Sequence, residues 1–217
     1  IEREALVCAK RIKECIDQGY EYGDIVILMR SMQARAGLFI RTLVRCGIPV
    51  FSDTSGGLFE ALEAQDVLSL LAVIDNPLQD IPLAAILRSP LFGAPLTDSE
   101  LVEIRRSPQG SSAGVAFSEA VWTYADRGAD AALQARLARI RDQIDKWRQR
   151  ARHRPLAETI WEVYEESGYL AYVSGLRDGL QRRANLVRIH EYARQFGSFR
   201  RQGLLRFLQF IDGVRAM

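Results

Sequence analysis

The chain has 217 residues, of which 48% are hydrophobic and 26% are charged, and its formal net charge is +2. This composition is typical of a globular protein with a real core, and it excludes a membrane span because no stretch approaches roughly 20 uncharged residues. The cysteines, Cys8, Cys15 and Cys46, show neither metal-ligand nor disulfide spacing and predict reduced thiols. The first residues lack methionine and are predicted to be helical rather than a signal peptide, so we expect the chain to be part of a longer protein.

The first part of the chain is predicted to alternate helices and strands. Helical spacing of apolar residues predicts helices over 4–18 and 32–46. The apolar run 25–29 is too short and continuous for a surface helix and predicts a strand that is buried on both faces. Residues 48–52 predict a second strand, and a strand–helix–strand unit favours parallel pairing with a right-handed crossover.

The rest of the chain is predicted to be helical. Helices over 59–74 and 81–87 end at Asn76-Pro77 and Ser89-Pro90. "TDSE" at 97–100 is a capping box that opens a further helix. Later helices are predicted over 113–126, 130–152, 156–167, 179–196 and 202–215. The predicted fold class is therefore an α/β half, residues 1–90, followed by an all-α half, residues 91–217.

Arg30 follows the predicted strand 25–29 directly. Ligands of open α/β sheets bind at the carboxyl ends of the strands, so an arginine at this position is placed to meet an anion. An arginine can stabilise the transition state of phosphoryl transfer. The alternative is an arginine that only forms a salt bridge at the surface, and spacing alone favours this alternative.

Basic residues are concentrated late in the chain. Residues 1–90 contain 9 Lys+Arg against 12 Asp+Glu, whereas residues 91–217 contain 20 against 15. The segments 136–154 and 177–206 each contain eight basic residues against two acidic ones. These segments either track the phosphates of a nucleic acid or form solvated helix faces.

Catalytic motifs for nucleophilic or metal chemistry are absent from the sequence. His153 and His190 have no partners at ligand spacing, and HExxH, CxxC, GxSxG and GxxxxGK[ST] do not occur. The acidic residues Glu60, Glu63, Glu165 and Glu166 are predicted to be solvated on helix surfaces rather than to form acid/base pairs. We therefore predict no metal ligands in this chain.

Several stretches together resemble the superfamily 1 helicases of the UvrD/RecB type, and in particular the A-type chains of the AddAB helicase–nucleases. The resemblance is carried by "DIVILMRS", "CGIPVFSDTSGGLFEALEAQDVLSLLAVIDNPLQDIPLAAILRSPLFG", "PLAETIWEVYEESGYLAYV" and "RRANLVRIHEYARQFGSFR". It covers most of the chain and is weakest over about 101–147.

This resemblance implies a site and a domain arrangement. "ILMRS" corresponds to helicase motif IV, so Arg30 is expected to contact the γ-phosphate of ATP and Met29 to pack against adenine. Residues 1–90 are expected to be part of motor domain 2A with a RecA-like parallel sheet, and residues 91–217 to be the helical 2B insertion. Arg88 at their junction is the expected DNA contact. ATP and Mg²⁺ are cofactors of the whole enzyme, and the fragment, without Walker and nuclease motifs, is expected to be inactive alone.

The function implied is ATP-dependent unwinding and processing of duplex DNA ends in double-strand break repair and recombination. The implied partners are single-stranded and duplex DNA and a B-type nuclease subunit, and the implied setting is the bacterial cytoplasm at the nucleoid, with no membrane. Two alternatives remain. One is a UvrD-type repair helicase without a nuclease, and the other is a non-enzymatic helical module that binds nucleic acid or protein.

Overall fold

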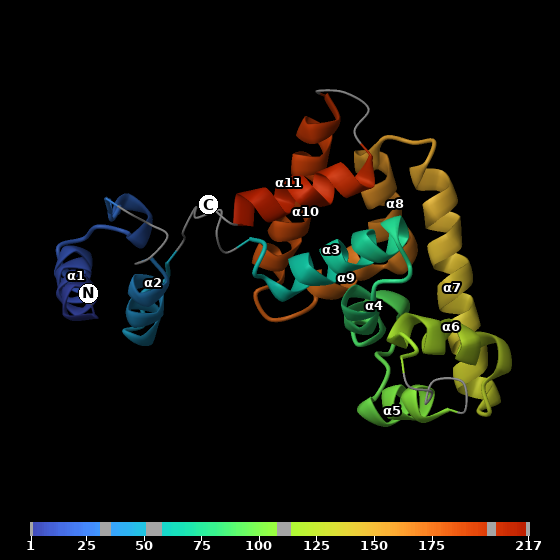
Figure 1. Cartoon of the computed structure of the whole chain (residues 1–217). Helices are drawn as coiled ribbons and strands as arrows, with labels where there is room; N and C mark the ends of the chain where they lie inside the picture. Colours follow the sequence, from blue (N-terminus) through green and yellow to red (C-terminus); the bar gives the residue numbers. More distant parts are fainter. Residues whose placement is uncertain (1, 31–35, 51–57, 108–113, 199–202, 216–217) are drawn as a thin grey trace. The chain divides into compact units, whose positions relative to one another are not determined.

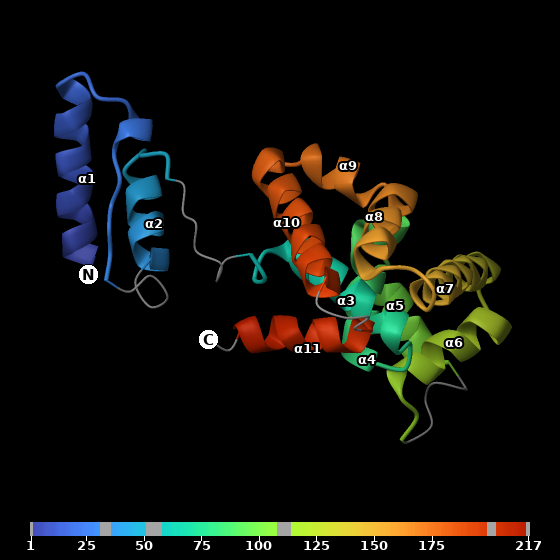
Figure 2. The same ribbon diagram turned by 90° about the horizontal axis from the view of Figure 1, so that it is seen from above.

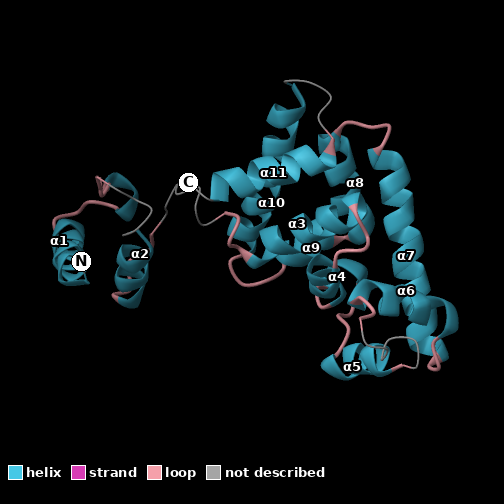
Figure 3. Ribbon diagram, in the orientation of Figure 1, coloured by secondary structure: helices cyan, strands magenta, loops and turns pink. Residues whose placement is uncertain are grey.

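The structure, a computed structural model, describes residues 2–30, 36–50, 58–107, 114–198 and 203–215 (Figure 1). The chain forms two compact units, residues 1–58 and residues 59–217. Throughout these described ranges every regular element is a helix, as the colours of Figure 3 show.

Unit 1 is built on two helices that pack against each other. They are α1 (Glu2–Asp17) and α2 (Ala36–Arg45), and a short 3-10 helix, η1 (Tyr22–Asp24), lies between them in sequence. Ala9 and Ile12 of α1 meet Leu43 of α2 and Ile48 in a small buried core. The apolar segment 25–29 runs beside both helices (Figure 2), and its residues Ile25 and Ile27 pack against that core.

The predicted parallel sheet is wrong. Residues 25–29 and 48–50 form no strand, and residues 51–52 lie outside the described residues. Only alternate side chains of the first segment pack, because Val26 and Leu28 are 75% and 91% exposed. A strand requires backbone pairing, and two short segments give at best a marginal two-stranded sheet. The segment is held instead by Ile25 and Ile27 against the helices.

Unit 2 contains the remaining helices, and α3 (Leu62–Asp75) lies at its centre. It contacts α4 (Asp80–Leu87), α7 (Ala131–Ala151), α10 (Gly179–Ser198) and α11 (Leu204–Arg215). A helix that is covered by several neighbours buries apolar residues on more than one face. The buried apolar residues of α3 are Ala64, Val67, Leu68, Leu70, Leu71, Val73 and Ile74.

Further contacts join the other elements of unit 2. The turn η3 (Pro90–Phe92) packs on α4, α5 (Asp98–Arg106) packs on α6 (Phe117–Arg127), and α6 packs along α7. Helices α8 (Leu156–Ser167) and α9 (Tyr169–Ser174) both pack against α10. The predicted helices are confirmed to within a few residues at their ends, whereas α9 was not predicted because it is six residues long.

The predicted apolar stripe of α7 is confirmed. Its five members, Leu133, Leu137, Ile140, Ile144 and Trp147, are all buried. An arginine next to this stripe also contributes to packing, because the Nε of Arg148 donates a hydrogen bond to the carbonyl oxygen of Ile74 at 3.0 Å. This bond joins the C-terminal end of α3 to α7.

Asp80 ties the start of α4 to the start of α6. Its carboxylate accepts hydrogen bonds from the backbone N–H groups of Phe117 at 3.0 Å and Ser118 at 2.9 Å, and from the Ser118 hydroxyl at 2.7 Å. The first N–H groups of a helix have no partner within it, so this carboxylate replaces an N-cap residue from a distance of 37 positions in sequence. The backbone N–H of Ser118, more than any other group, lowers the pKa of Asp80 below its ordinary 3.8.

We expect Asp80→Ala to lower the free energy of unfolding by about 1–2 kcal/mol near neutral pH, the cost of losing a helix cap. Because the folded pKa is depressed, this stabilisation is fully present above about 4 and is lost as the pH falls through the lower folded value. The difference from wild type should therefore shrink below pH 4, as measured by urea unfolding at several pH values. Asp142→Ala, at an exposed position of α7, is the control and should change stability by less than about 0.5 kcal/mol. A difference that persists unchanged at pH 3 would contradict this account.

Candidate functional site

Arg30 and Met29 lie at the end of the apolar segment of unit 1. Arg30 is exposed, and no ion pair holds it to another described residue. Met29 is half-buried and lines an apolar groove of about 710 Å³. The two residues thus present a guanidinium that is open to solvent beside an apolar surface, although residues 31–35, which follow them, lie outside the described residues.

The apolar groove of unit 1 is formed by both helices and by the segment between them. Its walls include Ile12 of α1, Phe39 and Leu43 of α2, and the side chains of Ile25 and Ile27. An apolar ligand group would fit against these walls better than a charged group would, because the lining offers few polar partners. The arrangement separates an apolar side, with Met29, from a cationic end, with Arg30.

Arg88 lies in unit 2, at the C-terminal end of α4. Its guanidinium forms a surface ion pair with Asp98 of α5 at 3.2 Å, and both side chains are more than half exposed. An exposed pair of this kind contributes about 0–1 kcal/mol, so a phosphate could replace Asp98 at little cost. The predicted DNA contact is therefore accessible but not free.

Four of the eight basic residues in 136–154 pair with acidic residues of neighbouring helices. Arg136 pairs with Glu100 of α5 at 3.3 Å, and Arg141 pairs with Asp126 of α6 at 2.7 Å. Further along, Arg150 and Arg154 pair with carboxylates of α8. The concentration of arginines in 136–154 therefore serves in large part to join α7 to α5, α6 and α8.

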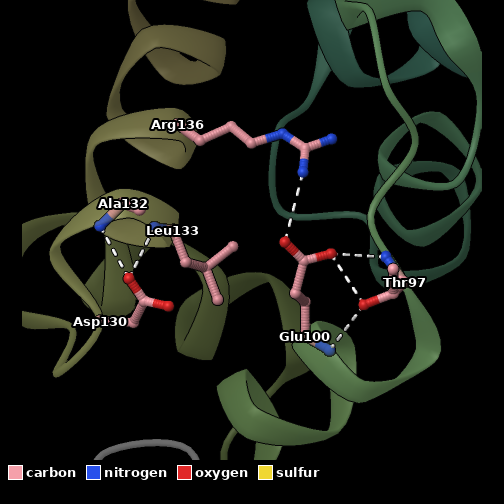
Figure 4. A network of polar contacts seen from close by, with 6 residues as sticks. All are labelled: Thr97, Glu100, Asp130, Ala132, Leu133 and Arg136. Atoms are coloured by element: carbon pink, nitrogen blue, oxygen red, sulfur yellow. Dashed lines mark hydrogen bonds and ion pairs between the residues drawn. The ribbon is translucent and has the colours of Figure 1, made fainter.

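Glu100 shows how one carboxylate supports two elements (Figure 4). It closes the predicted capping box, which is confirmed, by accepting from the backbone N–H of Thr97 at 2.6 Å, while the Glu100 N–H donates to the Thr97 hydroxyl at 3.2 Å. Its other oxygen accepts from Arg136 of α7. The backbone N–H of Thr97 is the main cause that lowers the pKa of Glu100. Next to this pair, Asp130 caps α7 by accepting from the N–H groups of Ala132 and Leu133.

Two carboxylates of α3 were missed by the sequence analysis. Glu63 was predicted to be solvated, but it is only 3% exposed and binds Arg182 at 2.8 Å and Asn185 at 2.7 Å, both on α10. Asp66, one turn further along, is also buried and accepts from the Tyr169 hydroxyl of α9 at 2.6 Å. Burial raises the pKa of Asp66, and burial together with the bond to Asp66 raises the pKa of Tyr169.

A signal for this burial was present in the sequence. Glu63 shares one helical face with Val67, Leu70 and Ile74, all apolar, so a helix that buries this face also buries the carboxylate. A buried charge requires a partner, and the partner on α10 lies 119 positions away in sequence. Periodicity could therefore have indicated the burial of Glu63 but not the identity of Arg182.

The described residues contain no group of three or more His, Cys, Asp or Glu side chains that could hold a metal ion. The donor set present in these ranges does not fit a Mg²⁺ site. None of the described helices is both long enough and apolar enough to span a bilayer.

Comparison with known proteins places the chain in a family. A sequence model of the UvrD-like helicase C-terminal domain matches residues 1–126, more than half of the chain. The chain belongs to the UvrD-like helicase C-terminal domain family. The matched part contains Met29, Arg30, Arg88 and the buried carboxylates of α3.

Relatives of this UvrD-like chain are similar to it over nearly its whole length. One is the A-type subunit of the ATP-dependent helicase/nuclease of Desulforudis audaxviator, which is 42% identical over 216 residues, or 98% of this chain and 17% of that protein. Proteins of the same name from Bacillus pumilus and Desulforamulus reducens are 40% and 43% identical, over 99% and 89% of this chain. The chain thus spans less than a fifth of the length of the curated relatives it matches.

Proposed function

We propose that this chain is part of an ATP-dependent DNA helicase/nuclease that unwinds and processes double-stranded DNA ends in double-strand break repair and recombination. The observation that carries the proposal is the 42% identity, over 98% of the chain, to a protein named as one subunit of an ATP-dependent helicase/nuclease. The match to the UvrD-like C-terminal domain supports the motor part of this function independently.

In this proposal Arg30 meets the γ-phosphate of ATP and Met29 packs against adenine. The exposed guanidinium next to a half-buried methionine supports these roles, because a nucleotide needs both a cationic contact and an apolar one. Other parts of the longer protein hold Mg²⁺ and the remaining phosphate contacts, since the described residues offer no metal-binding group. The chain alone is therefore expected to be inactive.

We assign residues 1–90 to motor domain 2A and residues 91–217 to a 2B-type insertion on the basis of the resemblance, and in this assignment α3 and α4 of the motor domain pack in one compact unit with residues 91–217. The partners are DNA, single-stranded and at duplex ends, and a B-type nuclease subunit, in the bacterial cytoplasm at the nucleoid. Arg88 contacts a DNA phosphate by exchanging Asp98 for it, and this exchange is possible because their ion pair is exposed.

A strand-separation assay with the full-length protein tests the proposal. With its partner subunit, ATP and Mg²⁺, the protein should unwind a blunt or forked duplex and shorten the released strands, and omission of ATP should abolish unwinding. Unwinding without shortening would favour a UvrD-type helicase. The absence of both unwinding and shortening would overturn the proposal. A DNA-binding titration at several salt concentrations tests Arg88. In it, Arg88→Ala should reduce the slope of log affinity against log salt by about one, which is the contribution of one phosphate contact.

A further inference from the structure

The α9–α10 corner of unit 2 presents a stacked pair of tyrosines. Tyr169 and Tyr172 lie one turn apart on α9, with ring centroids 6.2 Å apart and an interplanar angle of 21°. In the view from above, α9 lies at an outer edge of unit 2 next to α10 (Figure 2). Of the two rings, that of Tyr172 is the one open to solvent.

The inner ring of this pair is fixed in position. Tyr169 is 2% exposed, and its hydroxyl donates to the buried Asp66 of α3 at 2.6 Å. The outer ring belongs to Tyr172, which is 48% exposed. The Tyr172 ring therefore lies nearly parallel to a ring that is buried and hydrogen-bonded, while much of the Tyr172 side chain remains open to solvent.

Positive charge accompanies the open ring. Arg177 lies in the turn after α9, and its side chain is 96% exposed. Its Nε is 4.0 Å from the Oδ2 of the neighbouring Asp178, so this ion pair is long and weak. The backbone of this turn is held by Arg182, whose Nε donates to the Arg177 carbonyl oxygen at 3.1 Å while its NH1 binds Glu63. A rigid turn thus carries an arginine that reaches into solvent five residues after the open ring.

We propose that Tyr172 is a stacking platform for a base of single-stranded DNA and that Arg177 binds an adjacent phosphate. The inference rests on the proposed function and goes beyond it by placing a strand contact at the α9–α10 corner. Proteins that hold single strands combine aromatic rings, on which bases stack, with cations that follow the backbone. A tyrosine has only two side-chain torsions to fix, so the ordering cost of stacking a base on Tyr172 is small.

A protein partner is the rival occupant of this corner. Leu176 and Leu180 are exposed beside Tyr172 and would suit an apolar protein surface. The stacked geometry and the nearly fully exposed Arg177 favour a nucleic acid, because a base offers a planar face to the ring and its phosphate a charge to the arginine. Only the strand contact predicts that loss of the ring and loss of the arginine both weaken the same DNA complex.

Binding of a fluorescent oligothymidine by the full-length protein tests the proposal. Tyr172→Ala should weaken affinity roughly 5- to 100-fold, the usual effect of removing one stacked base contact, while Tyr172→Phe should stay near wild type. Arg177→Ala should weaken binding and lower the salt slope by about one. Tyr20→Ala is the matched control, since Tyr20 is similarly exposed but stacks on no described ring, and it should leave affinity unchanged.

The outcomes separate this inference from the proposed function. If the wild-type protein binds no DNA, the proposed function fails, whereas normal binding by Tyr172→Ala overturns the platform alone. If Tyr172→Ala binds DNA normally but no longer binds the partner subunit, Tyr172 forms a protein contact, and the proposed platform is overturned. As a measurement on wild type, photo-crosslinking to an oligonucleotide with 5-bromouracil should modify Tyr172. Adducts found only elsewhere would contradict the proposal even if Tyr172→Ala failed to fold.

Discussion

Arg30→Ala in the full-length protein should slow ATP hydrolysis by roughly 1,000-fold or more, the effect expected when an arginine that stabilises the transferring phosphoryl group is lost. The fold should be unaffected, because the Arg30 side chain is exposed and forms no ion pair with a described residue. Steady-state kcat for ATP in the presence of single-stranded DNA is the measurement. Arg30→Lys should recover only part of the activity, since a lysine keeps the charge but lacks the planar fork that binds two phosphate oxygens.

The matched control for Arg30 is Arg45→Ala in the same unit. Arg45 is also exposed and forms only a loose surface pair with Glu2 at 3.6 Å. Its removal should leave kcat unchanged and cost at most about 1 kcal/mol of stability. If Arg30→Ala hydrolysed ATP at the wild-type rate, Arg30 would have no part in the mechanism, and the alternative of a simple surface arginine would hold.

Arg182→Ala should be strongly destabilising, by about 3 kcal/mol, although the Arg182 side chain is partly exposed on α10. The substitution leaves the carboxylate of Glu63, which is 3% exposed, with Asn185 as its remaining described partner, and an uncompensated buried charge is costly. Urea unfolding followed by tryptophan fluorescence reports on unit 2 specifically, because Trp122, Trp147 and Trp161 all lie in it.

Two further variants distinguish this explanation from a general sensitivity of α10. Arg183→Ala, at the next and exposed position, should change stability by less than about 0.5 kcal/mol. The double variant Glu63→Leu/Arg182→Leu removes both charges together and should be less destabilising than Arg182→Ala alone. A double variant that is clearly worse than the single one would show that the pair stabilises the fold through its own attraction.

Local sequence patterns were sufficient for the helices and insufficient for the sheet. The apolar stripe of α7, from Leu133 to Trp147, and the capping box at Thr97 depend on neighbours within a few residues. The apolar run 25–29 satisfied the pattern of a buried strand equally well, but strand formation depends on a backbone partner from elsewhere. Residues 25–29 pair with no other backbone segment as a strand among the described residues.

In the candidate site, too, the features that depend on local sequence could be predicted and the long-range contacts could not. Sequence alone could select Arg30, Met29 and Arg88, because they lie at the end of an element or in a motif that resembles a helicase motif. Their roles stay predictions. The partners of charged groups could not be selected. Composition cannot indicate that Arg136 pairs with Glu100, or that Glu63 pairs with Arg182, since each pair joins elements far apart in the chain.

The position of α3 has a consequence for synthesis of the chain. The helices α7, α10 and α11 contact α3 but follow it in the chain, so α3 is synthesised long before they have left the ribosome. A nascent chain that has reached only residue 126, where the family match ends, would therefore leave the parts of α3 that contact these helices open to water. The boundary of the family match is thus not a boundary of independent folding, and α3 completes its burial only when α11 arrives.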